Sequence, residues 1–159
     1  MWKNLRNLII VTGHAIYKSG DPTNERNWFL HPFQKGEVVY YIEHIKNGVM
    51  LTKADKQALL LFAGGQTRKE AGPLSEGQSY WFVADYYKWW ETNVKERANT
   101  EEFSRDSFEN LLFSICRFHE CTGRYPQKIT VVSWKFKKER FLHHINTIKW
   151  PADRFFFFG

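Results

Sequence analysis

The chain has 159 residues, a net charge of +6 and an aromatic content of 18%. This length suffices for one sizeable hydrophobic core, whereas two domains of half the length would each be marginal. No apolar run reaches the roughly 18 to 20 residues that cross a bilayer, and the N-terminus lacks the features of a signal peptide. We therefore expect a single domain over residues 1–159, in the cytosol and without a membrane partner.

Two short apolar runs, at 8–11 and 58–63, end in corners that contain glycine. Continuous apolar runs are typical of buried parallel strands, and glycines just past a strand let the backbone approach a ligand. The corner residues are Thr12, Gly13 and His14 after the first run, and Gly64, Gly65, Thr67 and Arg68 after the second. These corners predict a ligand cleft, and a Gly-Gly turn without a ligand is the alternative.

The rest of the chain alternates between helical periodicity and further strand-like runs. Apolar spacing predicts helices over about 37–47, 75–92, 106–122 and 136–148, and strands at 129–132 and 155–158. Ser75 opens the second helix with a capping box, and Asp106 or Ser104 caps the third. We expect the segments 19–33 and 95–101 to be loops.

Strands that alternate with helices pair in parallel through right-handed crossovers, and the helices then cover both faces of the sheet. The pattern therefore predicts an α/β fold, a Rossmann-like three-layer sandwich with a mostly parallel sheet. In such a fold the carboxyl ends of the strands meet at one edge, where ligands bind. We expect His14 at this edge, as a general base, a donor to phosphate, or a loop cap.

Basic residues gather near the C-terminus, where residues 128–154 hold seven basic and two acidic side chains. Lys137 and Arg140 follow the third long strand, which ends at Ser133, so they are expected to bring positive potential to the cleft. A solvated helix face is the alternative. Trp134 and Phe136 could instead stack on nucleic-acid bases, but the chain contains no recognised nucleic-acid motif, so we do not favour nucleic acid as a partner.

Acidic and amide side chains cluster at two predicted helix starts. Glu76 lies in the first turn after Ser75, where the helix dipole alone favours an acid and where the cleft is also close. Glu102 and Ser104 precede the next helix, and Glu109 and Asn110 begin its apolar stripe. A partly buried amide needs hydrogen-bond partners. Glu102 is the acid or base candidate that could face Glu76 across the cleft.

Cys116, His119 and Cys121 resemble a metal-ligand set at first sight. On a helix, however, Cys121 points away from the other two, and a fourth ligand is lacking nearby. We therefore predict no metal site and two reduced, mostly buried thiols.

In order and spacing, these features resemble the YdcF/SanA/ElyC-like domain of unknown function, in its divergent eukaryotic branch. The shared features are the two glycine corners, the Glu at the next helix start, an E-x-x-S…E-N element, and a strand ending in Ser before a basic helix. The resemblance covers residues 8–159. It implies that the pocket is lined by Gly13, Gly64, Gly65, Glu76, Glu102, Ser104, Glu109, Asn110, Ser133 and Arg140.

Two features depart from that family. Trp134 and Lys135 stand where bacterial members usually have an acid or hydroxyl and a His, which puts chemistry that needs that His in doubt. The chain also ends on the run at 155–158, where members generally continue, so we expect a shortened form. Four consecutive phenylalanines are an aggregation hazard if they form an edge strand.

The family has been linked to bacterial envelope metabolism and to nucleotide-like ligands, S-adenosylmethionine among them. The leading hypothesis is a protein that binds an anionic or nucleotide-like small molecule, with His14, Glu76 and Glu102 as the catalytic candidates if it is an enzyme. A non-catalytic binding or scaffold module is the second hypothesis, and an RNA-binding accessory protein is the third. Standard dinucleotide, phosphate-loop and nucleophile-elbow motifs are absent, and the sequence identifies neither a cofactor nor an oligomeric state.

Overall fold

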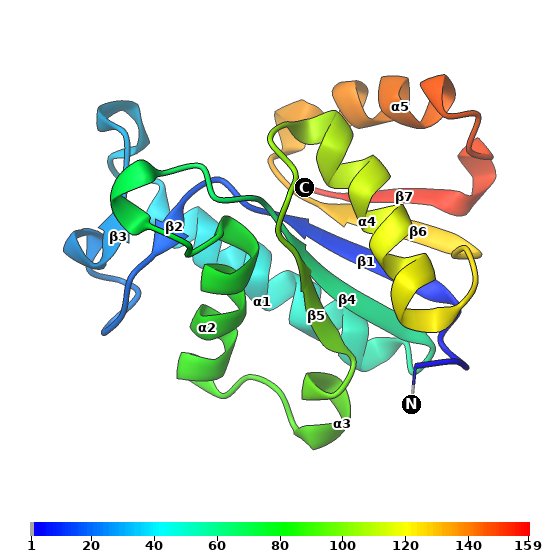
Figure 1. Ribbon diagram of the computed structural model, residues 1–159, viewed down its shortest axis with the longest axis horizontal. Helices are drawn as coiled ribbons and strands as arrows, with labels where there is room; N and C mark the ends of the chain where they lie inside the picture. The colour runs from blue at the N-terminus through cyan, green and yellow to red at the C-terminus, as the bar shows by residue number, and fades with distance from the viewer. Residues whose placement is uncertain (1) are drawn as a thin grey trace.

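The computed structural model describes residues 2–159, apart from the side chain of residue 92 (Figure 1). The strands are β1 (Asn7–Thr12), β2 (Ile16–Tyr17), β3 (Trp28–Phe29), β4 (Ala58–Ala63), β5 (Ala98–Glu101), β6 (Lys128–Val132) and β7 (Phe155–Phe158). The α-helices are α1 (Val38–Ala54), α2 (Glu76–Tyr87), α3 (Thr92–Lys95), α4 (Ser107–Thr122) and α5 (Lys138–Thr147). Short 3-10 helices are η1 (Glu25–Asn27), η2 (Pro32–Gln34), η3 (Lys69–Ala71), η4 (Lys135–Lys137) and η5 (Ala152–Arg154).

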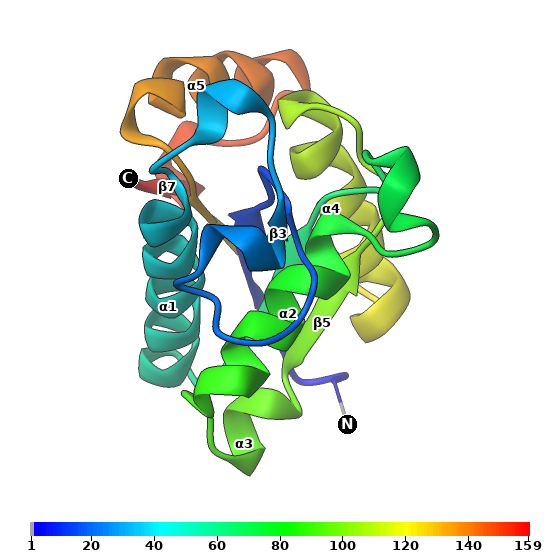
Figure 2. The same cartoon turned by 90° about the vertical axis from the view of Figure 1, so that its left-hand side faces the viewer.

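The main sheet has five strands in the order β5-β4-β1-β6-β7, and every neighbouring pair is parallel. Helices cover both faces, and Figure 2 shows α1 and α4 on opposite sides of the strands. The predicted three-layer α/β sandwich is confirmed. A separate two-stranded antiparallel ribbon, β2 with β3, lies between β1 and α1 in the chain.

The two central strands carry apolar side chains on both faces, and all residues of β1 and β4 are buried. Ile9 and Leu60 point to the core under α1 and α2, whereas Leu8 and Leu61 point to the core under α4 and α5. Each fully buried aliphatic side chain contributes about 1.5–3 kcal/mol. Alternate residues therefore serve different cores, which is why the sequence runs show no in/out alternation.

The helix ends mostly follow their capping residues. The Ser75 hydroxyl accepts the backbone N–H of Gln78 at the start of α2, and Asp106 rather than Ser104 caps α4 by accepting the N–H of Glu109. The prediction that α2 runs to about residue 92 is wrong. Lys88 adopts a left-handed conformation with φ of 53°, and its N–H returns to the carbonyls of Ala84 and Asp85, which ends the helix.

Helix α1 is longer than predicted because it continues through Gly48. A Cβ atom at this position would lie 2.3 Å from Cγ2 of Val11, so glycine is required for the helix to pack on β1. Helix α5 is shorter than predicted at its start, since residues 135–137 form the tighter η4.

Both predicted loops contain regular structure. Residues 98–101 form the edge strand β5, although the sequence Ala-Asn-Thr-Glu is polar. The free backbone of β5 is satisfied by side chains, because Asn99 accepts the N–H of Thr100 and Arg117 donates to the Thr100 carbonyl. In the other segment, buried Trp28 anchors β3 through its indole N–H, which donates to the Pro22 carbonyl at 2.8 Å.

The remaining strand and cysteine predictions have mixed outcomes. Strand β7 forms where predicted and lies at the edge of the sheet, with Phe156 and Phe158 nearly half exposed. Both cysteines are free, but Cys116 is exposed on α4, so the prediction of two mostly buried thiols is wrong. Within residues 2–159, no helix combines the length and the apolar character needed to cross a bilayer.

Candidate functional site

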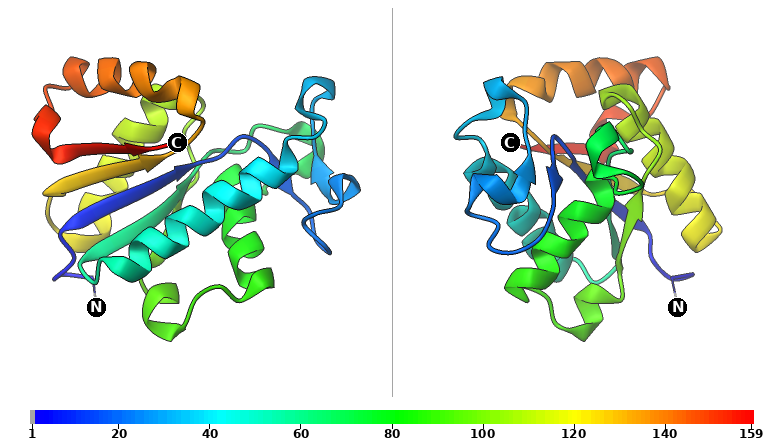
Figure 3. Two further views of the ribbon diagram at one scale, coloured as in Figure 1. Left: turned by 180° about the vertical axis from the view of Figure 1, so that it is seen from behind. Right: turned by 60° about the vertical axis from the view of Figure 1, so that its left-hand side comes forward.

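Strand β1 lies at the topological switch point of the sheet. The chain proceeds outward from β1 to β4 and β5 on one side, and then crosses to β6 and β7 on the other. Segments leaving the carboxyl ends of β1 and β6 therefore diverge, and α/β sheets bind ligands in the crevice that this creates. The segment between β1 and α1, including β2, β3 and η2, extends beyond this edge (Figure 3).

On the β4–β5 side of this edge, the backbone groups of the glycine corner form hydrogen bonds within the protein. The N–H of Gly64 donates to the Glu101 carbonyl, and that of Gly65 donates to the Ser104 carbonyl, both at 2.9 Å. The Gly65 carbonyl in turn accepts the N–H of Glu76 at 3.0 Å. A Cβ atom on Gly65 would lie 2.7 Å from the Ser104 carbonyl oxygen. Close packing of the chain therefore accounts for Gly65.

The polar residues after β5 also bond to one another. Glu101 is 3% exposed, and its Oε2 accepts the N–H groups of Phe103 at 2.6 Å and Ser104 at 2.9 Å. Glu102 accepts the hydroxyls of Ser75 and Thr100.

Glu101 is the residue that the sequence reasoning missed. The spacing E-x-x-S, counted back from Ser104, reaches Glu101 and not Glu102, so this signal was present in the sequence. Asn110 is 8% exposed and donates to the Ser104 hydroxyl at 2.7 Å, which is the partner that a buried amide requires.

Three of the predicted ligand-binding side chains lie outside this network. Glu109 pairs with Arg105 one turn away, accepting its Nε at 3.1 Å, and Arg68 pairs with Glu70. Arg140 is exposed on α5. The ion pairs engage Glu109 and Arg68 locally, although the buried Arg68 Nη1 has no hydrogen-bond partner among the described residues.

Thr12 and Ser133 join the carboxyl ends of β1 and β6. The Thr12 hydroxyl donates to the Ser133 Oγ at 2.7 Å, and both side chains are buried. This bond closes the floor of the crevice on the α4 and α5 side of the sheet, because Thr12 and Ser133 continue the alternation of Ile10 and Val131.

His14 and Lys137 meet on the β1–β6 side of the edge. The Lys137 Nζ lies 3.1 Å from the His14 Nε2 and donates to it, so the imidazole is neutral with its proton on Nδ1. Burial, reinforced by the charge of Lys137, lowers the pKa of His14 well below its usual value. Among the residues that the structure describes, the buried His14 Nδ1 has no hydrogen-bond partner.

Other side chains hold His14 in place. Its backbone N–H donates to the Tyr80 hydroxyl at 3.0 Å, and its ring stacks on Tyr41 with centroids 5.8 Å apart. Trp134 meets the ring edge-on, and His44 lies beside both rings. Burial lowers the pKa of His44 to about 4, and Lys137 adds to this effect. At neutral pH both histidines are therefore uncharged.

Glu76 lies between the two sides of the edge, close to Gly13 and Gly64. A Cβ atom at Gly13 would lie 2.7 Å from the Glu76 Cβ, and one at Gly64 would lie 2.5 Å from its Oε1. Burial raises the pKa of Glu76 to about 7, against the opposing effects of the Thr67 hydroxyl, which donates to Oε2 at 2.9 Å, and of the Lys137 charge. A carboxyl group with this pKa can exchange a proton at physiological pH.

A cavity of about 300 Å³ opens beside His14 and Lys137. Its other lining residues come from η2, from the start of α1 and from the segment after β6: Phe33, Gln34, Glu37, Tyr41, Trp134 and Phe136. Phe33 and Phe136 are 76% and 73% exposed at its mouth. No local pattern indicated the η2 residues, because their position depends on how the segment before α1 folds back.

A second cavity, of about 480 Å³, lies on the β4–β5 side. It is lined by four of the predicted site residues, Gly65, Thr67, Glu102 and Ser104, together with Gln66, Phe103 and Arg105. The structure thus divides the predicted residues between two neighbouring hollows, with His14 and Lys137 in one and the Gly65 group in the other. Glu76 lies next to both groups of residues. It is in close contact with Gly13, which precedes His14, and it accepts the hydroxyl of Thr67 on the other side.

Comparison with known proteins provides one relative. No family model matches this chain, and no solved structure matches it. The resemblance to the YdcF/SanA/ElyC-like family therefore stays a prediction. The chain is 33% identical to the uncharacterized protein YOR238W of Saccharomyces cerevisiae over an alignment of 201 residues, which includes 96% of this chain. This chain is thus similar to a yeast protein, and it spans 66% of that protein's length.

Proposed function

We propose that the protein binds an anionic, nucleotide-like small molecule in the cavity at the switch point between β1 and β6. The observation that carries this proposal is the Lys137–His14 pair. None of the described carboxylates forms an ion pair with half-buried Lys137, whose ammonium donates to the His14 Nε2. A partly desolvated ammonium with spare donors and no counter-charge is costly. A phosphate or carboxylate group would supply that counter-charge.

The aromatic wall of the cavity supports a ligand with a planar ring. Trp134 and Phe136 are stacked, with ring centroids 5.8 Å apart and planes at 22°. Phe33 lines the same cavity, and it is largely exposed, as is Phe136. Exposed aromatic rings beside cationic groups are the surroundings in which nucleobases stack. A cavity of about 300 Å³ is at the lower end of the range for small-molecule sites.

The proposal is tested with adenosine monophosphate, S-adenosylmethionine and inorganic phosphate as probes. We expect at least one nucleotide-like probe to raise the melting temperature and to bind in calorimetric titration. Lys137→Gln should weaken binding of adenosine monophosphate at least about tenfold, as expected for loss of a charge-assisted hydrogen bond. Lys138→Gln is the matched control on the exposed neighbour and should change the affinity less than about twofold.

Two results would contradict this proposal. One is that none of the three probes raises the melting temperature. The other is that Lys137→Gln and Lys138→Gln bind adenosine monophosphate equally well. We expect Lys137→Gln to fold. Burial lowers the pKa of Lys137, so the ammonium is already unfavourable in the folded protein and its removal should not destabilise the fold.

Catalysis is a second candidate function, and Glu76 favours it. A partly buried carboxyl with a pKa of about 7 beside the cleft is suited to general acid or base chemistry. For a substrate found in the probe screen, Glu76→Gln should abolish turnover and leave binding intact. Unchanged turnover would exclude Glu76 from catalysis, and the absence of turnover in the parent protein would support a non-catalytic binding module. Retention on polynucleotides that weakens steeply with salt would instead support the RNA-binding alternative.

The proposal includes membership of the YdcF/SanA/ElyC-like family and a cytosolic location. The free state of Cys116 and Cys121 is compatible with a reducing compartment. Cell fractionation of the tagged protein tests the location, and its recovery with secreted or organellar markers would contradict it.

A further inference from the structure

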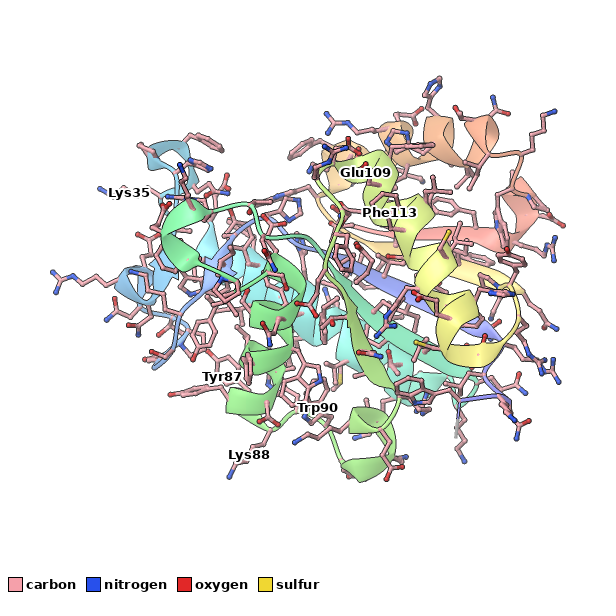
Figure 4. All side chains as sticks on the ribbon, in the orientation of Figure 1. Lys35, Tyr87, Lys88, Trp90, Glu109 and Phe113 are labelled. Atoms are coloured by element: carbon pink, nitrogen blue, oxygen red, sulfur yellow. The ribbon has the colours of Figure 1, made fainter. Side chains whose placement is uncertain are left out.

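The C-terminal part of α2 and the segment after it form an aromatic cluster at the opposite end of this helix from Glu76. Six of the residues from 81 to 90 are aromatic: Trp81, Phe82, Tyr86, Tyr87, Trp89 and Trp90. Figure 4 shows Tyr87, Lys88 and Trp90 gathered at this end of the helix. Phe82 and Tyr86 are 45% and 49% exposed, so the hydrophobic core does not account for the whole cluster.

One of these rings faces a cation, and a second ring packs beside it. Trp81 and Trp90 lie with centroids 5.3 Å apart and planes at 50°. The Lys95 Nζ lies 5.2 Å from the centroid of the Trp81 ring. It also donates to Asp85 Oδ1 at 2.9 Å, and the Trp90 indole N–H donates to the same oxygen at 3.3 Å. The group is thus an aromatic wall with a carboxylate fixed beside it.

This arrangement is open to solvent. The side chains of Lys95 and Asp85 are 46% and 40% exposed. They line a hollow of about 700 Å³ together with Trp81, Trp90 and three neighbours, which is far larger than an ammonium group requires. An exposed ion pair of this kind contributes little to stability. Another cation can therefore readily take the place of Lys95 beside Asp85.

We propose that Trp81, Asp85 and Trp90 form a binding site for an alkylammonium group, and that Lys95 is its internal competitor. Indole faces with a carboxylate are the chemistry that recognises quaternary ammonium groups and methylated lysine. A methylated ammonium is less strongly hydrated than a primary one, and it covers more of the ring surface. It can therefore displace Lys95, even though Lys95 has a high effective concentration at the site because it belongs to the same chain. The site is independent of the switch-point cavity.

Choline and trimethyllysine are the probes, with 3,3-dimethyl-1-butanol as the neutral isostere of choline. Binding is followed by the indole N–H signals of Trp81 and Trp90 in nuclear magnetic resonance titrations at constant ionic strength. We expect both cations to bind at least about fivefold more tightly than the neutral isostere, which is the range of a cation–π contact. Tighter binding of trimethyllysine supports the site with a protein ligand, and tighter binding of choline supports it with a small-molecule ligand.

The decisive variant is Lys95→Ala, because it should increase affinity. Removal of the internal competitor makes the binding-competent state more populated, so choline should bind about fivefold more tightly than to the parent protein. A misfolded variant cannot produce this gain. Lys88→Ala removes another lysine that lines the hollow, and its side chain, unlike that of Lys95, forms no hydrogen bond to Asp85 and does not lie over the Trp81 ring, so it should leave the affinity within about twofold.

Two further substitutions in the Lys95→Ala background test the ring and the carboxylate. Trp81→Phe keeps an aromatic side chain, and Asp85→Asn keeps the size of the side chain. Each should weaken choline binding at least about fivefold relative to Lys95→Ala alone. The proposal is overturned if choline and its neutral isostere bind equally, or if Lys95→Ala fails to strengthen choline binding. Binding of adenosine monophosphate should be the same in all these variants.

Discussion

The two halves of the carboxyl edge differ in how their polar groups are used. On the β4–β5 side, the N–H groups of Gly64 and Gly65, the Glu101 Oε2 and the Asn110 amide are all hydrogen-bonded within the junction, although the buried Glu101 Oε1 has no partner among the described residues. On the β1–β6 side, a buried imidazole nitrogen of His14 has no partner among the described residues, and Lys137 has no carboxylate paired with it.

The difference shows that density of polar residues does not by itself mark a binding site. The β4–β5 side has more acids, hydroxyls and amides in sequence, and most of them hold a tight junction between strand and helix. The β1–β6 side has fewer polar groups, but Lys137 is partly desolvated and is not paired with a carboxylate, so an anionic ligand can improve its energy. Glu76 touches both sides, and burial of part of its side chain raises its pKa to about 7.

The largest expected effect comes from Glu76→Gln, through the pH dependence of stability. The folded pKa of about 7 exceeds the ordinary value of 4.5, so the folded state holds the proton more strongly than the unfolded state. This contribution is fully present below pH 4.5 and is lost as the pH rises through 7. At about 1.4 kcal/mol per pKa unit, the loss amounts to about 3 kcal/mol.

The comparison is made between the parent protein and Glu76→Gln at each pH by denaturant unfolding. Lowered pKa values of His14 and His44 act in the opposite direction, and they are common to both proteins. We expect the variant to gain stability relative to the parent between pH 5 and 8. If the stabilities of the two proteins change with pH in parallel, the Glu76 carboxylate is well solvated. It would then not lie buried between the two sides of the edge.

Gly65→Ala tests whether the β4–β5 side is structural. The added methyl group would meet the Ser104 carbonyl at 2.7 Å, so we expect the free energy of unfolding to fall by about 1–3 kcal/mol. Affinity for adenosine monophosphate should stay within about twofold, in contrast with Lys137→Gln, which should lose affinity and keep stability. A folded Gly65→Ala variant that no longer binds the nucleotide would show that the glycine corner belongs to the ligand site.

The smallest effect is expected for Arg140→Gln. Arg140 is exposed on α5, so its charge acts on the cavity through solvent. At physiological salt we expect adenosine monophosphate affinity to change less than about twofold, with a larger effect at low salt, where screening is weaker. Calorimetric titration at two salt concentrations measures this. A loss at high salt as large as that of Lys137→Gln would place Arg140 in contact with the ligand.

Local sequence patterns determined the elements and the fold class. The apolar runs at β1, β4, β6 and β7 form strands, and the capping residues Ser75 and Asp106 open α2 and α4, because each of these signals depends on neighbours close in sequence. The sequence also indicated which edge of the sheet carries polar residues, since the carboxyl ends of parallel strands meet there.

Tertiary structure decided the rest. Strand β5 forms from a polar segment because β4 offers a free edge and Arg117 satisfies the outer carbonyl. The two sides of the candidate site differ in the same respect, because the β1–β6 side is built by a contact between residues far apart in sequence and the β4–β5 side largely by local contacts. Lys137 reaches His14 across 123 positions, and Asn110 and Glu101 find their partners within a few residues. Composition cannot distinguish these cases, because pairing and burial are properties of positions in space.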